Sequence, residues 1–272
     1  MPFTQSNGIV LHYRRIGRRG GPKIAFINSL GSDMAIWDDV ADLLGAVFDL
    51  LVYDKRGHGL SEVASSPCGI AGHGDDLLAL LNHLGWRETT LCGLSIGGLI
   101  AMDIAVRAPS RVTQLVLMDT AAKIGAAESW NARIDAVRQH GVAAIGDTIM
   151  ERWFAPAYRA RSPDAVSGWQ RMLERTPAVG YVDACKALRD TDLTDAIPGI
   201  VAPTLVLSGE NDLSTPPALV EATARRIAGA TFRIIPKAGH LPCIECPSEV
   251  AGQLAGFLGL ERVPRKLPRL ER

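Results

Sequence analysis

The run Gly93-Leu94-Ser95-Ile96-Gly97 constrains the fold more than any other feature of the chain. It follows an apolar stretch, residues 89–92, that is typical of a buried strand, and it opens onto a second apolar stretch with the character of a helix. Glycines at both ends allow the backbone to turn sharply between the two. Such a turn lifts a serine hydroxyl out of the edge of a sheet, so Ser95 is the candidate nucleophile.

A serine hydroxyl is a weak nucleophile at neutral pH and needs a base, which an acid then orients. His240 and Asp212 each follow an apolar, strand-like stretch, so both are expected in loops at the ends of strands. The order serine, aspartate, histidine predicts that Asp212 orients His240 and that His240 activates Ser95. Asp119, which ends another apolar stretch, is the alternative acid.

Attack of a serine on an ester also requires hydrogen-bond donors for the developing oxyanion. The backbone N–H of Ile96, which follows the nucleophile, is one candidate donor. The second is expected in the loop Asn28–Ser32, which follows the apolar stretch Lys23–Ile27. We select the backbone N–H of Leu30 for that role.

Apolar strand-like segments alternate with helical segments over residues 1–120, and strands resume over residues 201–261. This alternation predicts an α/β core with a mostly parallel sheet and helices on both faces. Residues 121–200 lose the strand rhythm and predict an inserted helical cap, or lid, that closes over the serine and selects the substrate. Residues 262–272 carry basic side chains around two prolines and are expected to form a disordered tail.

Composition argues against several classes of partner. The formal net charge is +0 and no basic patch is interleaved with aromatic residues, so neither nucleic acid nor a membrane is an expected partner. The N-terminus lacks the regions of a signal peptide, which predicts a cytoplasmic protein. Five scattered cysteines suggest reduced thiols, and Cys243 and Cys246 lack a second pair, so no metal site is expected. The oligomeric state stays open.

Several motifs together resemble the 3-oxoadipate enol-lactonases of the α/β-hydrolase superfamily, over nearly the whole chain up to the tail. The motifs are residues 27–31, 54–59, 92–98, 119–125 and 239–243. The 54–59 and 92–98 motifs are shared with many α/β-hydrolases. Residues 119–125, followed by 130–133 and 150–154, look more specifically like the enol-lactonase cap.

This resemblance implies the α/β-hydrolase fold with an eight-stranded sheet and no cofactor. It also implies hydrolysis of 3-oxoadipate enol-lactone to 3-oxoadipate, a step in bacterial breakdown of aromatic compounds through the β-ketoadipate pathway. The expected partner is therefore a small anionic lactone, whose free carboxylate requires a cation in a largely apolar pocket.

Arg133 is the leading candidate for that cation, with Trp130 covering the lactone ring and Trp153 forming a pocket wall. Lys123 is a weaker candidate cation. The alternatives are that Arg133 is simply exposed on a helix and that Trp153 belongs to the core of the cap.

Two other functions stay open at this point. A broad carboxylesterase or lactonase would use the same three residues on neutral esters, and only a preference for charged substrates separates it from the enol-lactonase. A protein of another class, a ligand-binding receptor on a hydrolase fold, is disfavoured because the serine, aspartate and histidine are all present.

Overall fold

The structure is a computed structural model in which residues 2–260 are described. Eight strands form one sheet in the order β1-β2-β4-β3-β5-β6-β7-β8. Strands β1 and β2 and strands β2 and β4 pair antiparallel, and every later pair is parallel. The strands are β1 (Phe3–Ser6), β2 (Ile9–Gly17), β3 (Lys23–Ile27), β4 (Asp49–Tyr53), β5 (Thr89–Leu94), β6 (Val112–Met118), β7 (Thr204–Gly209) and β8 (Thr231–Ile235). The predicted α/β architecture is confirmed.

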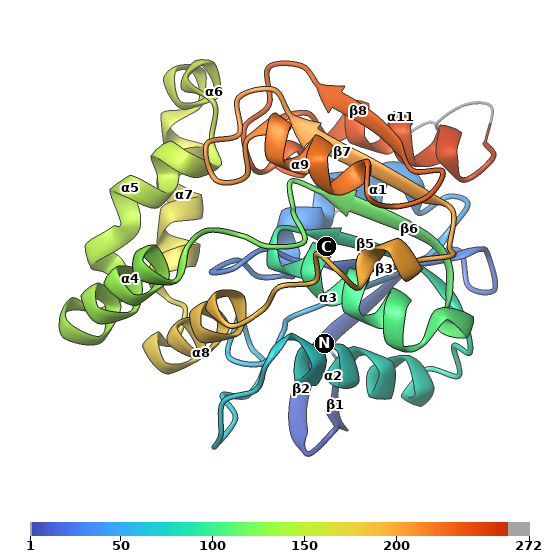
Figure 1. Ribbon diagram of the computed structural model, residues 1–272, viewed down its shortest axis with the longest axis horizontal. Coiled ribbons are helices and arrows are strands. Elements are labelled where there is room, and N and C mark those ends of the chain that lie inside the picture. The colour runs from blue at the N-terminus through green and yellow to red at the C-terminus, as the bar shows by residue number, and fades with distance from the viewer. Residues whose placement is uncertain (1, 261–272) are drawn as a thin grey trace.

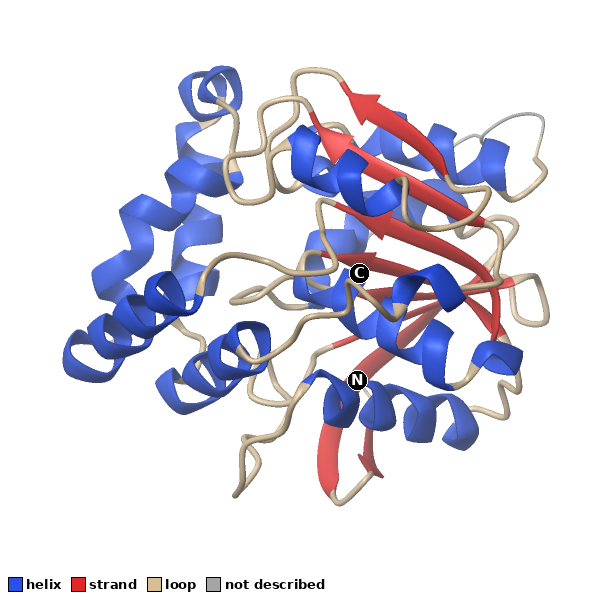
Figure 2. Cartoon of the chain, in the orientation of Figure 1, coloured by secondary structure: helices blue, strands red, loops and turns tan. Residues whose placement is uncertain are grey.

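The central strands are continuous apolar runs because helices cover both of their faces. Helices α1 (Asp38–Leu44) and α11 (Pro247–Phe257) pack against each other, as do α2 (Ile70–His83) and α3 (Ile96–Arg107). Figure 2 shows helices on both sides of the twisted sheet. The shorter helices α9 (Pro217–Ala224) and α10 (Pro242–Glu245) complete the C-terminal part of the chain.

The parallel register brings the carboxyl ends of the central strands together. Ile27 pairs with Gly93 at the ends of β3 and β5, and Met118 pairs with Leu94 on one side and Leu207 on the other. The loops that follow β3, β5, β6 and β7 therefore meet at one edge of the sheet. In α/β sheets this edge is where ligands bind.

Helices fill the described chain between β6 and β7, where no strand occurs, as the sequence predicts. They are α4 (Ala127–His140), α5 (Gly146–Trp153), α6 (Pro156–Arg161), α7 (Pro163–Glu174) and α8 (Ala178–Arg189). Helix α4 packs against α8, and α5 against α7. They form a cap on the left of Figure 1, beside the edge toward which the arrowheads of the strands point.

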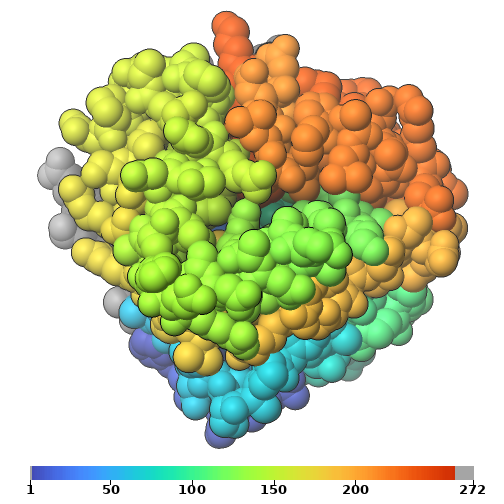
Figure 3. Space-filling model, turned by 60° about the vertical axis from the view of Figure 1, so that its left-hand side comes forward, coloured from blue at the N-terminus to red at the C-terminus, as the bar shows by residue number. Residues whose placement is uncertain are grey.

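The cap and the core meet across a hollow, where yellow-green residues of the cap face orange residues of the C-terminal half (Figure 3). The division at residues 120/121 and 200/201 stays a prediction. The predicted tail, residues 262–272, lies outside the described residues. Among those that are described, no helix is both long and apolar enough to span a membrane.

Candidate active site

Ser95 lies in the turn between β5 and α3 and has backbone angles of φ 58° and ψ −120°. A positive φ is strained for a residue with a side chain. The turn is possible because the residues two positions before and after Ser95 are glycines, which have no Cβ. A Cβ added at Gly93 would lie 2.1 Å from the carbonyl oxygen of Gly97, and one added at Gly97 would lie 2.2 Å from the carbonyl oxygen of Ile27. The sequence therefore folds into the sharp strand-to-helix turn that it predicts.

His240 and Asp212 meet below the cap. Their loops follow β8 and β7, and His240 Nδ1 lies 2.8 Å from Asp212 Oδ2. Asp212 also accepts hydrogen bonds from the backbone N–H groups of Ser214 and Thr215 and from the Thr215 hydroxyl, at 2.6–3.1 Å. Burial alone raises the pKa of Asp212, but the His240 charge and these hydrogen bonds outweigh it and hold the pKa below its usual range.

Asp119, the alternative acid, makes a different contact. Its Oδ1 accepts a hydrogen bond of 2.7 Å from the backbone N–H of Gly209, and its Oδ2 is buried without a partner among the described residues. Burial, followed by the charge of Asp212, raises the pKa of Asp119 well above its usual range. Two adjacent buried carboxyls cannot both ionise easily, so Asp119 retains its proton and Asp212 carries the charge.

The side chains of Asp119, Asp212 and His240 each place one ligand-type atom within 4.8 Å of the others, a spacing that could hold a metal ion. His240 Nδ1 and Asp212 Oδ2 already share a hydrogen bond, and all three side chains are buried. His240 and Asp212 therefore satisfy each other as a hydrogen-bonded pair, with the Asp119 carboxyl beside them.

A cavity of about 170 Å³ lies between the core and the cap. The core contributes Ser95, His240, Leu30, Ser29 and Ser214. The cap and the segments at its ends contribute Ile124, Gly125, Ser129, Trp130, Arg133, Ile149, Arg152, Trp153, Tyr181 and Leu188. Seven of these fifteen residues are serine, arginine or histidine, so the cavity combines apolar and aromatic walls with many polar groups that could orient a charged small molecule.

The two backbone groups predicted to face an oxyanion lie at this cavity or beside it. Ile96 is the first residue of α3, so its N–H has no acceptor within the helix. Leu30 lines the cavity from the loop after β3. The geometry is therefore compatible with the predicted pair of donors.

The three predicted substrate-binding residues all line the cavity. The guanidinium carbon of Arg133 lies 4.9 Å from the centre of the Trp130 ring, and Trp130 Nε1 donates a hydrogen bond of 2.6 Å to the carbonyl of Ile124. Trp153 is buried at the end of α5. Lys123, in contrast, is exposed beside Asp192 at 3.1 Å and does not line the cavity.

Arg152 and Tyr181 also line the cavity, although no sequence motif predicts a role for either of them. Partial desolvation and the charge of Arg133, which lines the same cavity, lower the pKa of Arg152. Ile149, Arg152 and Trp153 follow an i, i+3, i+4 pattern that places them on one helix face, a signal that the sequence does contain.

Comparisons with known proteins identify the class. The chain belongs to the alpha/beta hydrolase family, whose model matches residues 24–253. It is similar to 3-oxoadipate enol-lactonase 2 of Acinetobacter baylyi, with 34% identity over 88% of this chain and 89% of that protein. It is also similar to 3-oxoadipate enol-lactonase 1 of the same organism, with 31% identity over 94% and 96%.

Among solved structures, the enol-lactonase from Burkholderia xenovorans LB400 has a TM-score of 0.92 and 36% identity, covering 94% of this chain and 99% of that one. The resemblance read from the motifs is confirmed. Together, these relatives show that the chain is an ester-hydrolysing enzyme of the α/β-hydrolase fold.

Proposed function

We propose that this enzyme opens 3-oxoadipate enol-lactone, a small anionic lactone, to 3-oxoadipate through an acyl-enzyme on Ser95. One observation carries the proposal: the cavity that holds Ser95 and His240 also holds two neighbouring arginines, Arg133 and Arg152. The enol-lactonases named above add support, since they match this chain over most of its length.

The first half of the reaction forms the acyl-enzyme. His240 Nε2 takes the proton of the Ser95 hydroxyl as its oxygen attacks the lactone carbonyl carbon. The carbonyl oxygen becomes an oxyanion and accepts hydrogen bonds from the N–H groups of Leu30 and Ile96. Collapse of this intermediate breaks the ring C–O bond, and His240 returns its proton to the enol oxygen that leaves.

The second half releases the product. The enol remains attached to the acyl chain and tautomerises to the ketone. His240 then takes a proton from a water molecule, whose oxygen attacks the acyl carbon. Collapse of the second intermediate breaks its bond to the Ser95 oxygen, which regains a proton from His240. Asp212 stays ionised throughout and stabilises the imidazolium through the 2.8 Å contact.

The cap supplies binding rather than chemistry in this proposal. The guanidinium of Arg133, with Arg152 beside it, would hold the free carboxylate of the lactone. The indole rings of Trp130 and Trp153 would cover the flat ring and keep water from it. A neutral ester would offer no negative charge to the two guanidinium groups in the cavity, which is why the geometry favours an anionic substrate.

The test is the turnover of freshly generated 3-oxoadipate enol-lactone, followed by the loss of its ultraviolet absorbance, beside p-nitrophenyl acetate and with Ser95→Ala as control. The proposal expects fast lactone opening that depends on Ser95, with slow ester cleavage. Faster turnover of the neutral ester would indicate a general esterase. Binding of the lactone without turnover would indicate the receptor alternative.

A further inference from the structure

Lys55 is a fully buried lysine for which the proposed mechanism has no use. It follows Asp54 in the loop after β4, and only 1% of its surface is exposed. Burial lowers the pKa of its ammonium group to about 7, and the charges of Asp54 and Asp33 oppose that shift. A buried amine requires hydrogen-bond partners, so its contacts identify what it does.

The amine of Lys55 contacts the loop Asn28–Ser32, which carries the candidate oxyanion donor. Its Nζ donates a hydrogen bond of 2.7 Å to the carbonyl oxygen of Ser29. That oxygen also accepts hydrogen bonds from the Ser32 backbone N–H at 3.3 Å and from the Ser32 hydroxyl at 3.0 Å. Of these three donors, Lys55 makes the shortest contact and is the one that reaches in from another loop.

The carbonyl of Ser29 and the N–H of Leu30 belong to the same peptide group. This group is planar and trans, because the described chain contains no cis peptide bond, so the C=O and the N–H point in opposite directions. A donor that fixes the Ser29 oxygen therefore fixes the direction of the Leu30 N–H. Both residues line the cavity that contains Ser95.

A second effect is electronic. Hydrogen bonds in a chain polarise one another, and a charged or strongly polar donor on a carbonyl oxygen makes the N–H of the same peptide a better donor. The effect is larger in a buried site than in water. Lys55 therefore both orients and strengthens the N–H of Leu30.

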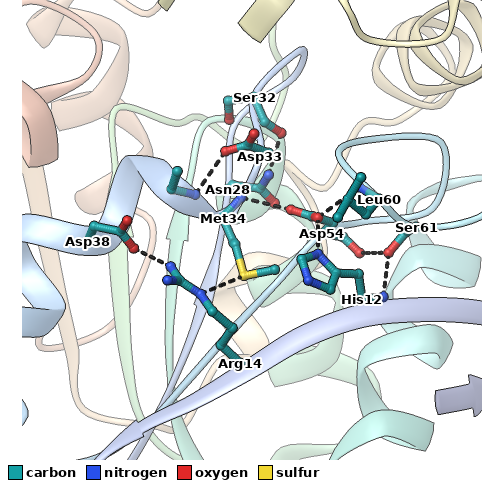
Figure 4. A network of polar contacts seen from close by, with 11 residues as sticks. His12, Arg14, Asn28, Ser32, Asp33, Met34, Asp38, Asp54, Leu60 and Ser61 are labelled. Atoms are coloured by element: carbon teal, nitrogen blue, oxygen red, sulfur yellow. Dashed lines mark hydrogen bonds and ion pairs between the residues drawn. The ribbon is translucent and has the colours of Figure 1, made fainter. Parts of the chain in front are cut away.

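The segment that follows this loop is held by Asp54, the residue next to Lys55. Asp54 Oδ1 accepts a hydrogen bond of 2.8 Å from the backbone N–H of Met34, while its Oδ2 contacts His12 Nδ1 at 2.7 Å and the N–H of Leu60 at 3.0 Å. Figure 4 shows Asp54 at the centre of this network, with the Asn28 side chain bonded to the carbonyl of Ser32. None of these contacts involves the side chain of Lys55, so all of them remain available when the lysine is replaced.

We propose that Lys55 is a positioning residue for the oxyanion site: its amine holds and polarises the Ser29–Leu30 peptide, so that the Leu30 N–H stabilises the tetrahedral intermediate. This inference rests on the proposed function, in which Leu30 contacts the oxyanion. Lys55 itself does not touch the substrate.

The test compares Lys55→Met with Lys23→Met in the full-length enzyme. Lys23 begins β3, at the end of that strand opposite the cavity, so its variant makes the same chemical change away from the site. With p-nitrophenyl acetate, Lys55→Met is expected to lower kcat about 10- to 100-fold with KM within about twofold, less than the loss seen when an oxyanion donor is removed outright. Lys23→Met is expected to match the wild type.

A transition-state analogue separates positioning from general damage. A trifluoromethyl ketone forms a bond between its carbonyl carbon and the Ser95 oxygen, the serine proton passes to His240, and the resulting oxyanion faces Leu30 and Ile96. Lys55→Met should weaken inhibition by this ketone by the same factor as kcat, as expected for a group that acts only in the transition state. Burst titration of the acyl-enzyme counts correctly folded sites, so kcat is expressed per active site.

The outcomes are distinct. If Lys55→Met kept the wild-type kcat per active site and the wild-type affinity for the ketone, the inference would be overturned, even if that variant were less stable. A proportional loss with Lys23→Met would overturn it as well. If Ser95→Ala retained activity, the proposed function would fail and the role of Lys55 with it. If Ser95→Ala is inactive and only the lactone assay fails, the ester assay still decides on Lys55.

Discussion

The backbone N–H of His240 donates a hydrogen bond of 2.9 Å to the carbonyl oxygen of Trp153, so a cap residue that lines the cavity is bonded to the candidate base itself. The N–H of Leu241 contacts the same oxygen at 3.3 Å. The end of α5 and the loop that carries His240 therefore form one unit. A movement of the cap would have to leave this corner in place or disturb the base.

The side chain of Glu245 adds two hydrogen bonds to this corner. Its carboxylate accepts hydrogen bonds from the backbone N–H of Ala155 at 3.0 Å and from that of Gly239 at 2.7 Å. One residue thus connects the cap segment after Trp153 to the residue before His240. Burial raises the pKa of Glu245 to about 7, against the opposing effect of these two donors and of Arg161.

This shift predicts a pH dependence of stability. Because its pKa is raised from 4.5 to about 7 on folding, the folded protein binds the Glu245 proton more tightly than the unfolded chain does. The contribution is fully present below pH 4.5 and is lost as pH rises to about 7, by up to roughly 3 kcal/mol. Glu245→Gln should lack this loss.

Urea unfolding of both proteins between pH 4.5 and 8 measures the difference. The free energy of unfolding of the wild type minus that of Glu245→Gln should fall as pH rises through this window and then become constant. The exposed Glu249→Gln on α11 controls for the loss of a carboxylate. A constant difference between wild type and Glu245→Gln would contradict the prediction.

The same substitution at the two buried aspartates is expected to change kcat to very different extents. Because Asp119 retains its proton, Asp119→Asn replaces one neutral group with another, and kcat is expected to change only a few fold. Asp212→Asn removes the charge that orients His240, and kcat is expected to fall about 10⁴-fold, as when the aspartate of a serine-protease triad is replaced. Steady-state kinetics on one ester measures both.

If Asp119→Asn lost as much activity as Asp212→Asn, the assignment of the charge to Asp212 would be wrong. Thermal unfolding of both variants would then show whether the loss comes from the chemistry or from the fold.

Local sequence was enough to predict the elbow and the loops of Asp212 and His240, because each lies directly after an apolar strand and parallel strands end at one edge. Boundaries were less accurate. The apolar run from Val47 to Tyr53 predicts a strand over all seven residues, whereas β4 begins at Asp49, because the N–H groups of Val47 and Phe48 bond back to the carbonyl of Leu44 at the end of α1.

The alternation of apolar residues from Ile9 to Tyr13 predicts the first strand there and leaves out β1, although the sequence contains a signal for the hairpin that joins β1 to β2. Asn7 and Gly8 both have positive φ, and Asn-Gly is the dipeptide favoured in tight hairpins between antiparallel strands. The contacts of Lys55 and Glu245 had no comparable local signal. These contacts join segments far apart in the sequence, so they became visible only when the chain was folded.

The arginine pair predicts a dependence on substrate charge. Arg133→Met and Arg152→Met should each raise KM for the anionic lactone about 10-fold or more, because each loses a charge-assisted contact in a partly desolvated site. KM for neutral p-nitrophenyl acetate should stay within about twofold. Lys123→Met removes an exposed charge paired with Asp192 and should change neither.

Equal losses on both substrates would show that the arginines act by packing, for which the contact of Arg133 with Trp130 provides a route. Unchanged lactone kinetics in both arginine variants would place the carboxylate elsewhere in the cavity.

Gly180 marks the point where the cap helix α8 crosses the loop after β4. A Cβ at this position would lie 2.3 Å from the backbone oxygen of Gly57, which cannot move aside as a flexible side chain could. Gly180→Ala should therefore push α8 from the core and lower the free energy of unfolding by about 1–3 kcal/mol. It should also raise KM, because the next residue, Tyr181, lines the cavity.

Gly168 in α7 provides the matched control, since a Cβ there would meet nothing within 4 Å. Gly168→Ala should raise the free energy of unfolding by about 0.5–1 kcal/mol through helix propensity alone. Opposite signs for the same substitution in two cap helices would show that the approach of α8 to the core, rather than helix propensity, sets the effect at residue 180. Urea unfolding of the two variants measures both free energies. A Gly180→Ala variant more stable than the wild type would contradict the close approach of α8 to the Gly57 loop.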